Sequence, residues 1–107
     1  MTDDAESADS RAEQGTDDEL ISRWKSGEQR AATLLVERYV DSVARFITSL
    51  GVRHDVEDVV QDTFVRAFAS IDGFRGESQL RTWLFTIARR LVLDARRAAR
   101  QIGRAHV

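Results

Sequence analysis

Apolar residues along the chain recur mainly at steps of three and four, which is the period of amphipathic helices. The first such pattern lies in TDDELISRWKSG, residues 16–27. Thr16 and Glu19 form a Thr-x-x-Glu capping box there, and Gly27 is a stop signal. The apolar positions are Leu20, Ile21 and Trp24. This pattern predicts a short leading helix.

Two longer patterns of the same period follow and predict two core helices. The first, EQRAATLLVERYVDSVARFITSLG, ends at Gly51; its apolar positions are Ala32, Leu35, Val36, Tyr39, Val43, Phe46, Ile47 and Leu50. The second, VEDVVQDTFVRAFASI, has Asp55 as its expected cap. Its apolar positions are Val56, Val60, Phe64, Ala67, Phe68 and Ile71. Each helix therefore presents one apolar side to a core.

A last helix is expected from Gln79 to about Arg100, roughly 33 Å at 1.5 Å per residue, with Ser78 as its N-cap. The turn-rich loop DGFRGES precedes it. The core side would carry Leu80, Leu84, Ile87, Leu91, Ala95 and Ile102. The opposite side would carry Thr82, Thr86, Arg89, Arg96 and Arg100, with Gln79, Arg90 and Arg97 on one flank beside Trp83. No strand-like alternation and no proline occur. The predicted fold is all-α, a compact bundle of three main helices plus a short N-terminal helix.

The net charge of −2 hides a strong polarity along the chain. Residues 1–19 contain eight acids against Arg11 alone, whereas residues 75–107 contain eight arginines, no lysine and two acids. A local basic face can bind a polyanion whatever the total charge, and arginine suits bidentate contacts to phosphates and bases. A merely solvated helix face is the competing interpretation.

The two ends of the chain are expected to lie outside the folded domain, which would span residues 16–102. Residues 1–15 are acidic and poor in large apolar residues, which predicts a disordered tail. As a hypothesis, this tail folds back on the arginines and weakens non-specific DNA binding. Residues 103–107 would form a C-terminal tail or the start of a linker.

Bulk properties exclude several other classes. The 107 residues favour one domain, and the chain has no cysteine. His54 and His106 lie far apart, so neither a structural metal nor a cofactor is expected. No apolar run reaches the roughly 18 residues of a membrane span, and the N-terminus is not a basic signal peptide. A cytoplasmic protein is the default expectation.

The loop and the last helix together are typical of a single-stranded nucleic-acid surface. Arginines would follow the backbone while aromatic residues and loop atoms hold an unstacked base. Gly76 lets backbone groups approach a base closely, because no Cβ intrudes. The competing interpretation is that Trp83 and Phe85 complete the core.

The third helix has a different character. Asp55, Asp58 and Asp62 fall on one side of it, with Gln61 adjacent. Acids in the first turn favour helix formation, but Asp62 lies beyond that turn. Such a strip would dock a basic partner helix. No nucleophile or metal cluster accompanies the carboxylates, so the chain is not expected to be an enzyme.

Three patterns at these spacings resemble region 2 of the extracytoplasmic-function sigma factors, the small alternative members of the bacterial sigma-70 family. They are Asp58-x-x-Gln61, the run from Phe74 to Ser78, and Trp83-Leu-x-x-Ile-Ala88, within a similarity from about Asp17 to Arg100. Leu84 after Trp83 fits the small class, since primary sigma factors have paired tryptophans near this point.

The resemblance implies two partners. The acidic helix would bind a coiled coil of the RNA polymerase β′ clamp through Asp55, Asp58, Gln61 and Asp62. The loop and last helix would bind the promoter −10 element as single-stranded non-template DNA, with one base turned out into a pocket of the loop. The DNA-binding residues would be Phe74, Arg75, Gly76, Ser78, Gln79, Trp83, Thr86, Arg89, Arg90 and Arg97.

Two departures from the family change what is expected. Family members commonly have asparagine at the position of Arg90, so the usual −10 preference is not carried over; arginine there would favour guanine edges or hold phosphate. The helix-turn-helix that reads the −35 element has no counterpart after Val107, which predicts a domain fragment or a chain that cannot select a promoter alone.

Two alternatives stay open. In the first alternative, the domain would mainly bind an anti-sigma factor, a role that is compatible with polymerase binding. A duplex-binding helix-turn-helix regulator would instead place the basic helix in a major groove, but the short turn that this motif requires is missing before that helix.

Overall fold

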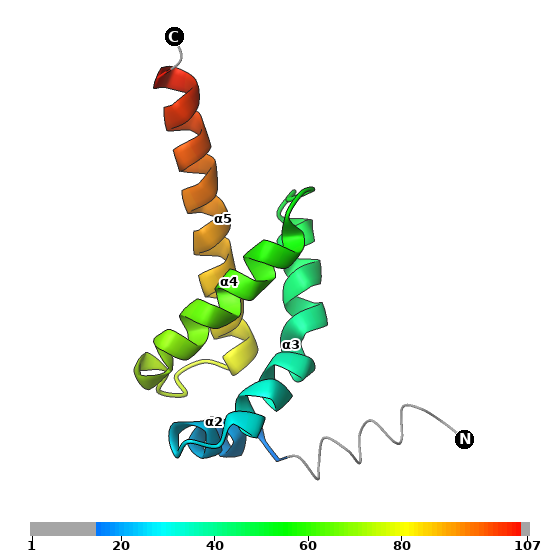
Figure 1. Ribbon diagram of the computed structural model, residues 1–107, viewed down its shortest axis with the longest axis vertical. Helices are drawn as coiled ribbons and strands as arrows, with labels where there is room; N and C mark the ends of the chain where they lie inside the picture. The colour runs from blue at the N-terminus through cyan, green and yellow to red at the C-terminus, as the bar shows by residue number, and fades with distance from the viewer. Residues whose placement is uncertain (1–14, 106–107) are drawn as a thin grey trace, which may run out of the picture. The chain divides into compact units, whose positions relative to one another are not determined.

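The structure is a computed structural model that describes residues 15–105, with side chains as far as Gln101. Four α-helices lie in this range (Figure 1): α2 (Asp17–Lys25), α3 (Gln29–Ser49), α4 (Val56–Ala69) and α5 (Leu80–Ala105). A short 3-10 helix, η1 (Ile71–Gly73), follows α4. No strand occurs between residues 15 and 105, which confirms the all-α fold class. The predicted disordered tail lies outside the described residues up to position 14.

The chain divides after Arg38 into two compact units. The first contains α2, which begins and ends where the sequence predicts. The Thr16 side chain accepts a hydrogen bond from the Glu19 N–H at 3.2 Å. At the other end the Gly27 N–H donates to the carbonyl of Trp24 and the Glu28 N–H to that of Arg23. This pair of bonds is a Schellman motif, and Gly27 at φ 101° supplies the left-handed residue that it requires.

Charged side chains of the first unit are bonded to one another. Arg38 donates to Asp17 at 2.8 Å and to the carbonyl of Gly15 at 2.9 Å, with its side chain only 13% exposed. Arg23 and Glu28 form a second, more exposed ion pair at 2.7 Å across the turn after α2. The buried residues of this unit are Leu20, Ile21, Ala31, Leu34 and Leu35. Ala31 and Leu34 therefore replace the predicted Ala32 as buried positions of α3.

The second unit runs from Tyr39 through α4, η1 and α5, and α4 packs against α5. Its buried apolar residues are Val43, Ile47, Val60, Phe64, Ala67, Ile71, Leu80, Leu84, Ala88 and Val92. Burial of each larger side chain in this set stabilises the fold by about 1.5–3 kcal/mol. Thr63 is fully buried as well, and its hydroxyl donates to the Val59 carbonyl at 2.7 Å, so no polar atom of that side chain lacks a partner.

The buried side of α5 differs from the predicted one. Ala88 and Val92 are buried, whereas Ile87 and Leu91 are half-buried and Ala95 is exposed. The buried positions follow four-residue steps, which turn gradually around the helix, so the contact line moves off the predicted stripe. All residues from Leu93 to Gln101 are exposed, and the side chain of Ile102 is outside the described set. Figure 1 shows these last turns, orange to red, extending beyond α4.

The helix also ends later than predicted, at Ala105 rather than near Arg100. None of the helices between residues 15 and 105 combines the length and the hydropathy of a membrane span.

Candidate functional site

The loop before α5 is anchored at one end and open along the rest of its length. The Phe74 ring is half-buried and lies 5.1 Å from the Trp83 ring at an interplanar angle of 47°. Tilted aromatic pairs of this kind are favourable beyond the area that they bury. Arg75, Gly76 and Ser78 are exposed. The aromatic pair therefore fixes the start of the loop while the next residues face solvent.

Gly76 is needed for its backbone conformation rather than for space. Its φ is +75°, a region that L side chains rarely adopt, and nothing lies within 4 Å of the position that a Cβ would occupy. The backbone of the loop is consequently open to approach from outside at this residue.

The N-cap of α5 is one residue later than predicted. The helix begins at Leu80, and the Trp83 N–H bonds to the Gln79 carbonyl at 3.1 Å, which places Gln79 at the capping position. The Ser78 hydroxyl donates to the Gln79 carbonyl at 3.3 Å and caps no helix N–H. The prediction of Ser78 as N-cap is wrong, because the chain turns one residue further before it enters the helix. Both side chains are exposed.

The outward side of α5 carries four exposed arginines, which we call the arginine ridge: Arg89, Arg90, Arg97 and Arg100. Within residues 15–101 their one ion pair is Arg97 with Asp94, 3.9 Å apart and largely exposed, a geometry that contributes little. Thr86 is exposed beside them, and its hydroxyl donates to the Thr82 carbonyl at 3.0 Å. The positive charge of the ridge is therefore available to an external anion.

Arg96 differs from its neighbours on the ridge. Its guanidinium donates to the carbonyl of Leu50, the residue after the end of α3. Carbonyls at a helix C-terminus lack partners within their helix, and a cation there is favourable. Arg96 thus stabilises the second unit, although the sequence pattern groups it with the outward arginines.

The acidic residues of α4 point outward. Asp58, Gln61 and Asp62, together called the acidic face, are all exposed. Steps of three and four residues place them on one side of the helix, opposite the buried Val60 and Phe64. Neither Asp58 nor Asp62 has an ion pair within residues 15–101. Asp58 lies in the first turn, where it favours the helix dipole, whereas Asp62 lies beyond the reach of that effect.

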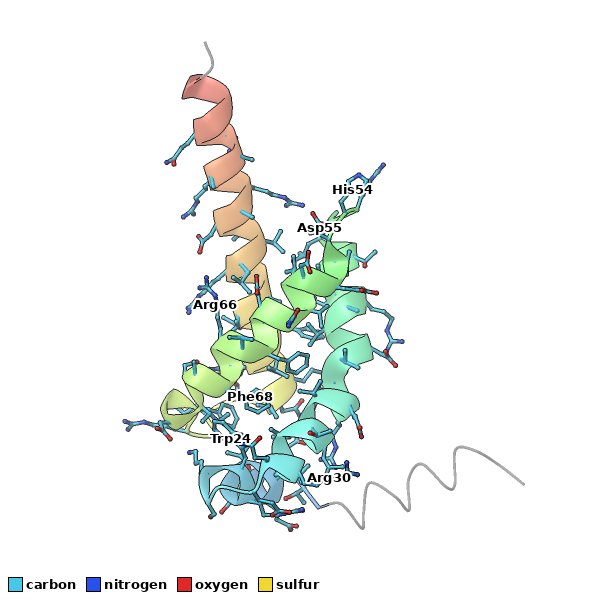
Figure 2. The ribbon with its side chains drawn as sticks, in the orientation of Figure 1. Trp24, Arg30, His54, Asp55, Arg66 and Phe68 are labelled. Carbon is cyan, nitrogen blue, oxygen red and sulfur yellow. The ribbon has the colours of Figure 1, made fainter. Side chains whose placement is uncertain are left out.

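Asp55 occupies the N-cap position of α4 but does not cap it with its side chain. The residue is left-handed, with φ 62° and ψ 28°, and its carboxylate makes no capping hydrogen bond. An N-cap side chain reaches the helix N–H groups from an extended backbone, so this conformation directs the carboxylate elsewhere. The predicted side-chain cap is wrong. Figure 2 shows Asp55 next to His54 at the tip of the loop before α4.

The sequence did not predict the partner of Phe85 or the exposure of two hydrophobic residues. The Phe46 and Phe85 rings stack at 4.2 Å, nearly parallel, and the Arg81 guanidinium lies 5.2 Å from the Phe85 ring centre. Phe85 is therefore engaged with α3, as the core interpretation of this residue held. Val65 on α4 and Leu93 on α5 are exposed large hydrophobic residues. The exposure of Val65 could have been predicted from its seven-residue spacing from Asp58, because that spacing places it on the polar side of α4.

Other kinds of site gain no support from the described residues. Between residues 15 and 101, no group of three or more His, Asp or Glu side chains could hold a metal ion. Residues 70–79 separate α4 from α5, whereas a helix-turn-helix joins its two helices by three or four residues. The basic helix is thus not the second helix of that motif.

Comparison with known proteins gives consistent matches. The family model described as Sigma-70 region 2 matches residues 35–102. The ECF RNA polymerase sigma-E factor of Haemophilus influenzae is 48% identical over 77 residues, which cover 72% of this chain and 41% of that protein. The proteins of the same name from Salmonella typhimurium and Escherichia coli K12 are each 44% identical over 77 residues, 72% of this chain and 40% of theirs. The chain therefore spans about two fifths of the length of these curated relatives.

Proposed function

The chain belongs to the sigma-70 family as a region 2 domain of the extracytoplasmic-function type, and from this we propose that it binds the RNA polymerase core and captures promoter DNA. The acidic face would bind the β′ clamp. The loop before α5 and the arginine ridge would hold the −10 element as single-stranded non-template DNA. Residues 16–102 would form the functional domain.

The observation that carries this proposal is the separation of two unpaired charge sets. The carboxylates lie on α4 and the guanidinium groups on α5, exposed in both cases and without close ion pairs within residues 15–101. Exposed charges without a close ion pair in the fold are suited to partners of opposite charge. One set fits a basic protein surface and the other fits a polyanion.

The loop before α5 and the arginine ridge would make different contacts with the DNA. A base turned out of the stack loses a few kcal/mol of stacking, which contacts with a fitting pocket offset. The exposed backbone at Gly76 and the Phe74–Trp83 pair would line such a pocket. Arg75, Gln79 and Thr86 would add polar contacts, and the ridge would contact phosphates. Arg90 would contact a phosphate or a guanine edge.

The binding test compares DNA forms. The domain would be titrated with single-stranded oligonucleotides randomised at their central positions, and with the matching duplexes, in the presence and absence of the polymerase core. We expect tighter binding to one strand than to the duplex, and selection of a defined sequence when the core is present. Preference for duplex DNA under both conditions would contradict the proposal.

The polymerase contact is tested with variants of α4. Asp62→Asn and Gln61→Ala should each weaken core binding by about five- to tenfold, since truncation at an interface centre costs more than about 1 kcal/mol. The matched control is Asp41→Asn, which removes the same charge from an exposed position on α3 instead of α4. Equal effects of Asp62→Asn and Asp41→Asn would show that the face has no specific role.

An anti-sigma factor, as the main partner or a competing one, and a cytoplasmic location stay predictions. The alternative of a duplex-binding helix-turn-helix is disfavoured by the long connection between α4 and α5.

A further inference from the structure

Val65 is an exposed apolar residue at the C-terminal edge of the acidic face. It is 61% exposed, and among the described residues Leu93, at 36%, is the other large hydrophobic residue that is exposed. Val65 follows Asp62 by three residues and Gln61 by four, so it lies directly beside both on the outward side of α4.

Folding gives no reason for a valine at this position. The buried side of α4 is formed by Val60, Thr63, Phe64 and Ala67. Valine has a lower helix propensity than the polar residues that usually cover an exposed helix side. A single exposed apolar residue is common on protein surfaces, but this one adjoins carboxylates that have no partner within residues 15–101.

Charge alone would make the acidic face a weak binding surface. Exposed ion pairs typically contribute less than about 1 kcal/mol each and are screened by salt. Most of the affinity of a protein interface comes from a few residues near its centre, surrounded by polar contacts that exclude water. Val65 would fit such a centre, with Gln61 and Asp62 as polar contacts on its N-terminal side.

We infer that Val65 is the apolar anchor of the polymerase-binding surface, and that its partner presents an apolar side chain flanked by basic ones. The inference rests on the proposed function of the acidic face. The carboxylates guide the approach of the partner and fix its orientation, and their contribution to affinity falls as the salt concentration rises. Val65 supplies a contribution that salt does not screen.

The test measures the affinity of the whole chain for purified polymerase core over a series of salt concentrations. Val65→Thr keeps the shape and the β-branching of the side chain and replaces one methyl group by a hydroxyl. We expect it to weaken binding about fivefold at every salt concentration, with an unchanged dependence on salt. Val65→Ile should bind at least as tightly as the original chain, and Asp62→Asn should reduce the salt dependence.

Leu93→Thr is the control, because it also replaces an exposed apolar side chain by threonine, at the other exposed hydrophobic residue, on α5. It should leave core binding unchanged. Circular dichroism of all variants checks that their helix content is equal.

The outcomes separate the two claims. Unchanged binding of Val65→Thr beside weakened binding of Asp62→Asn would overturn the anchor and leave the proposed function in place. A Val65→Thr effect that disappears at high salt, or that Leu93→Thr reproduces, would also overturn the anchor. If none of the α4 variants changed core binding, the proposed role of the acidic face would be wrong as well.

Discussion

The two compact units use charged side chains in different ways. In the first, Arg38 is bonded to Asp17 and to a backbone carbonyl, and Arg23 is bonded to Glu28. In the second, the acidic face and the arginine ridge are exposed, and within residues 39–101 their closest ion pair is the 3.9 Å contact of Arg97 with Asp94. The first unit thus uses these charges for its own stability, whereas the charges of the acidic face and the arginine ridge stay exposed in the second.

The difference shows why composition alone gives so little information about function. Both units contain acids and arginines, and the net charge of −2 distinguishes neither. What distinguishes them is whether a charge already has a partner inside the fold, because a paired charge is less available to a ligand. Substitutions should therefore separate into those that change stability and those that change binding.

The largest expected effect is the loss of Arg38. Arg38→Ala should lower the free energy of unfolding by about 2 kcal/mol, because it removes two hydrogen bonds and leaves the 27% exposed Asp17 side chain without this cation. Urea denaturation measures the change. Arg30→Ala, an exposed arginine on the same helix, should stay within about 0.5 kcal/mol. Equal losses in the free energy of unfolding for the two variants would contradict the distinction between paired and exposed charges.

Arg96 and Arg97 give a sharper comparison within the second unit. Arg96→Gln should lower the free energy of unfolding by about 1 kcal/mol, because the carbonyl of Leu50 loses its donor, and should leave the salt dependence of DNA binding unchanged. Arg97→Gln should leave stability within about 0.5 kcal/mol. For single-stranded DNA it should reduce the slope of log affinity against log salt by about 0.7.

Denaturation and salt-dependent binding of both variants provide the measurements. A reduced salt slope for Arg96→Gln with stability unchanged would place Arg96 on the ridge after all, and would contradict its assignment as a support for α3.

The smallest expected effect concerns the stability of the fold at acidic pH. The hydrogen bond from Arg23 lowers the pKa of Glu28 below its ordinary value of 4.5. A lowered pKa in the folded state means that the stability from this carboxylate is present above its ordinary value, and is lost as pH falls through the lowered one. Between about pH 5 and pH 3, the free energy of unfolding of the original chain should therefore fall slightly more than that of Glu28→Gln. The difference should be small, because the ion pair is exposed. Equal changes in the free energy of unfolding of the two chains over this range would contradict the prediction.

Helix number, type and most boundaries could be predicted, because the signals are local. Apolar periodicity, the Thr16 cap and the glycine stops at Gly27 and Gly51 depend on neighbouring residues only. The prediction failed where the backbone conformation of one residue decided the outcome. Asp55 turns left-handed and Ser78 lies one residue too early, and no residue pattern distinguishes these from ordinary caps.

The exposed charges of the candidate site were placed correctly, since helical spacing alone puts them opposite the core. The bond from Arg96 to Leu50 was not predictable, because it joins residues 46 positions apart. Thr63 was missed because a hydroxyl that bonds within its own helix can be buried like an apolar group. Val65 was passed over because it belonged to no core stripe.

The absence of burial from Leu93 to Gln101 has a consequence for the energetics of α5. Helical turns without tertiary packing are only marginally stable, so these last turns depend on local propensity and on the bond from Arg96 to Leu50. A DNA strand bound along these turns would also favour their helical conformation over the frayed one. The measured enthalpy of association would then include heat from ordering the protein itself, and it would grow more negative as warming frays the free helix.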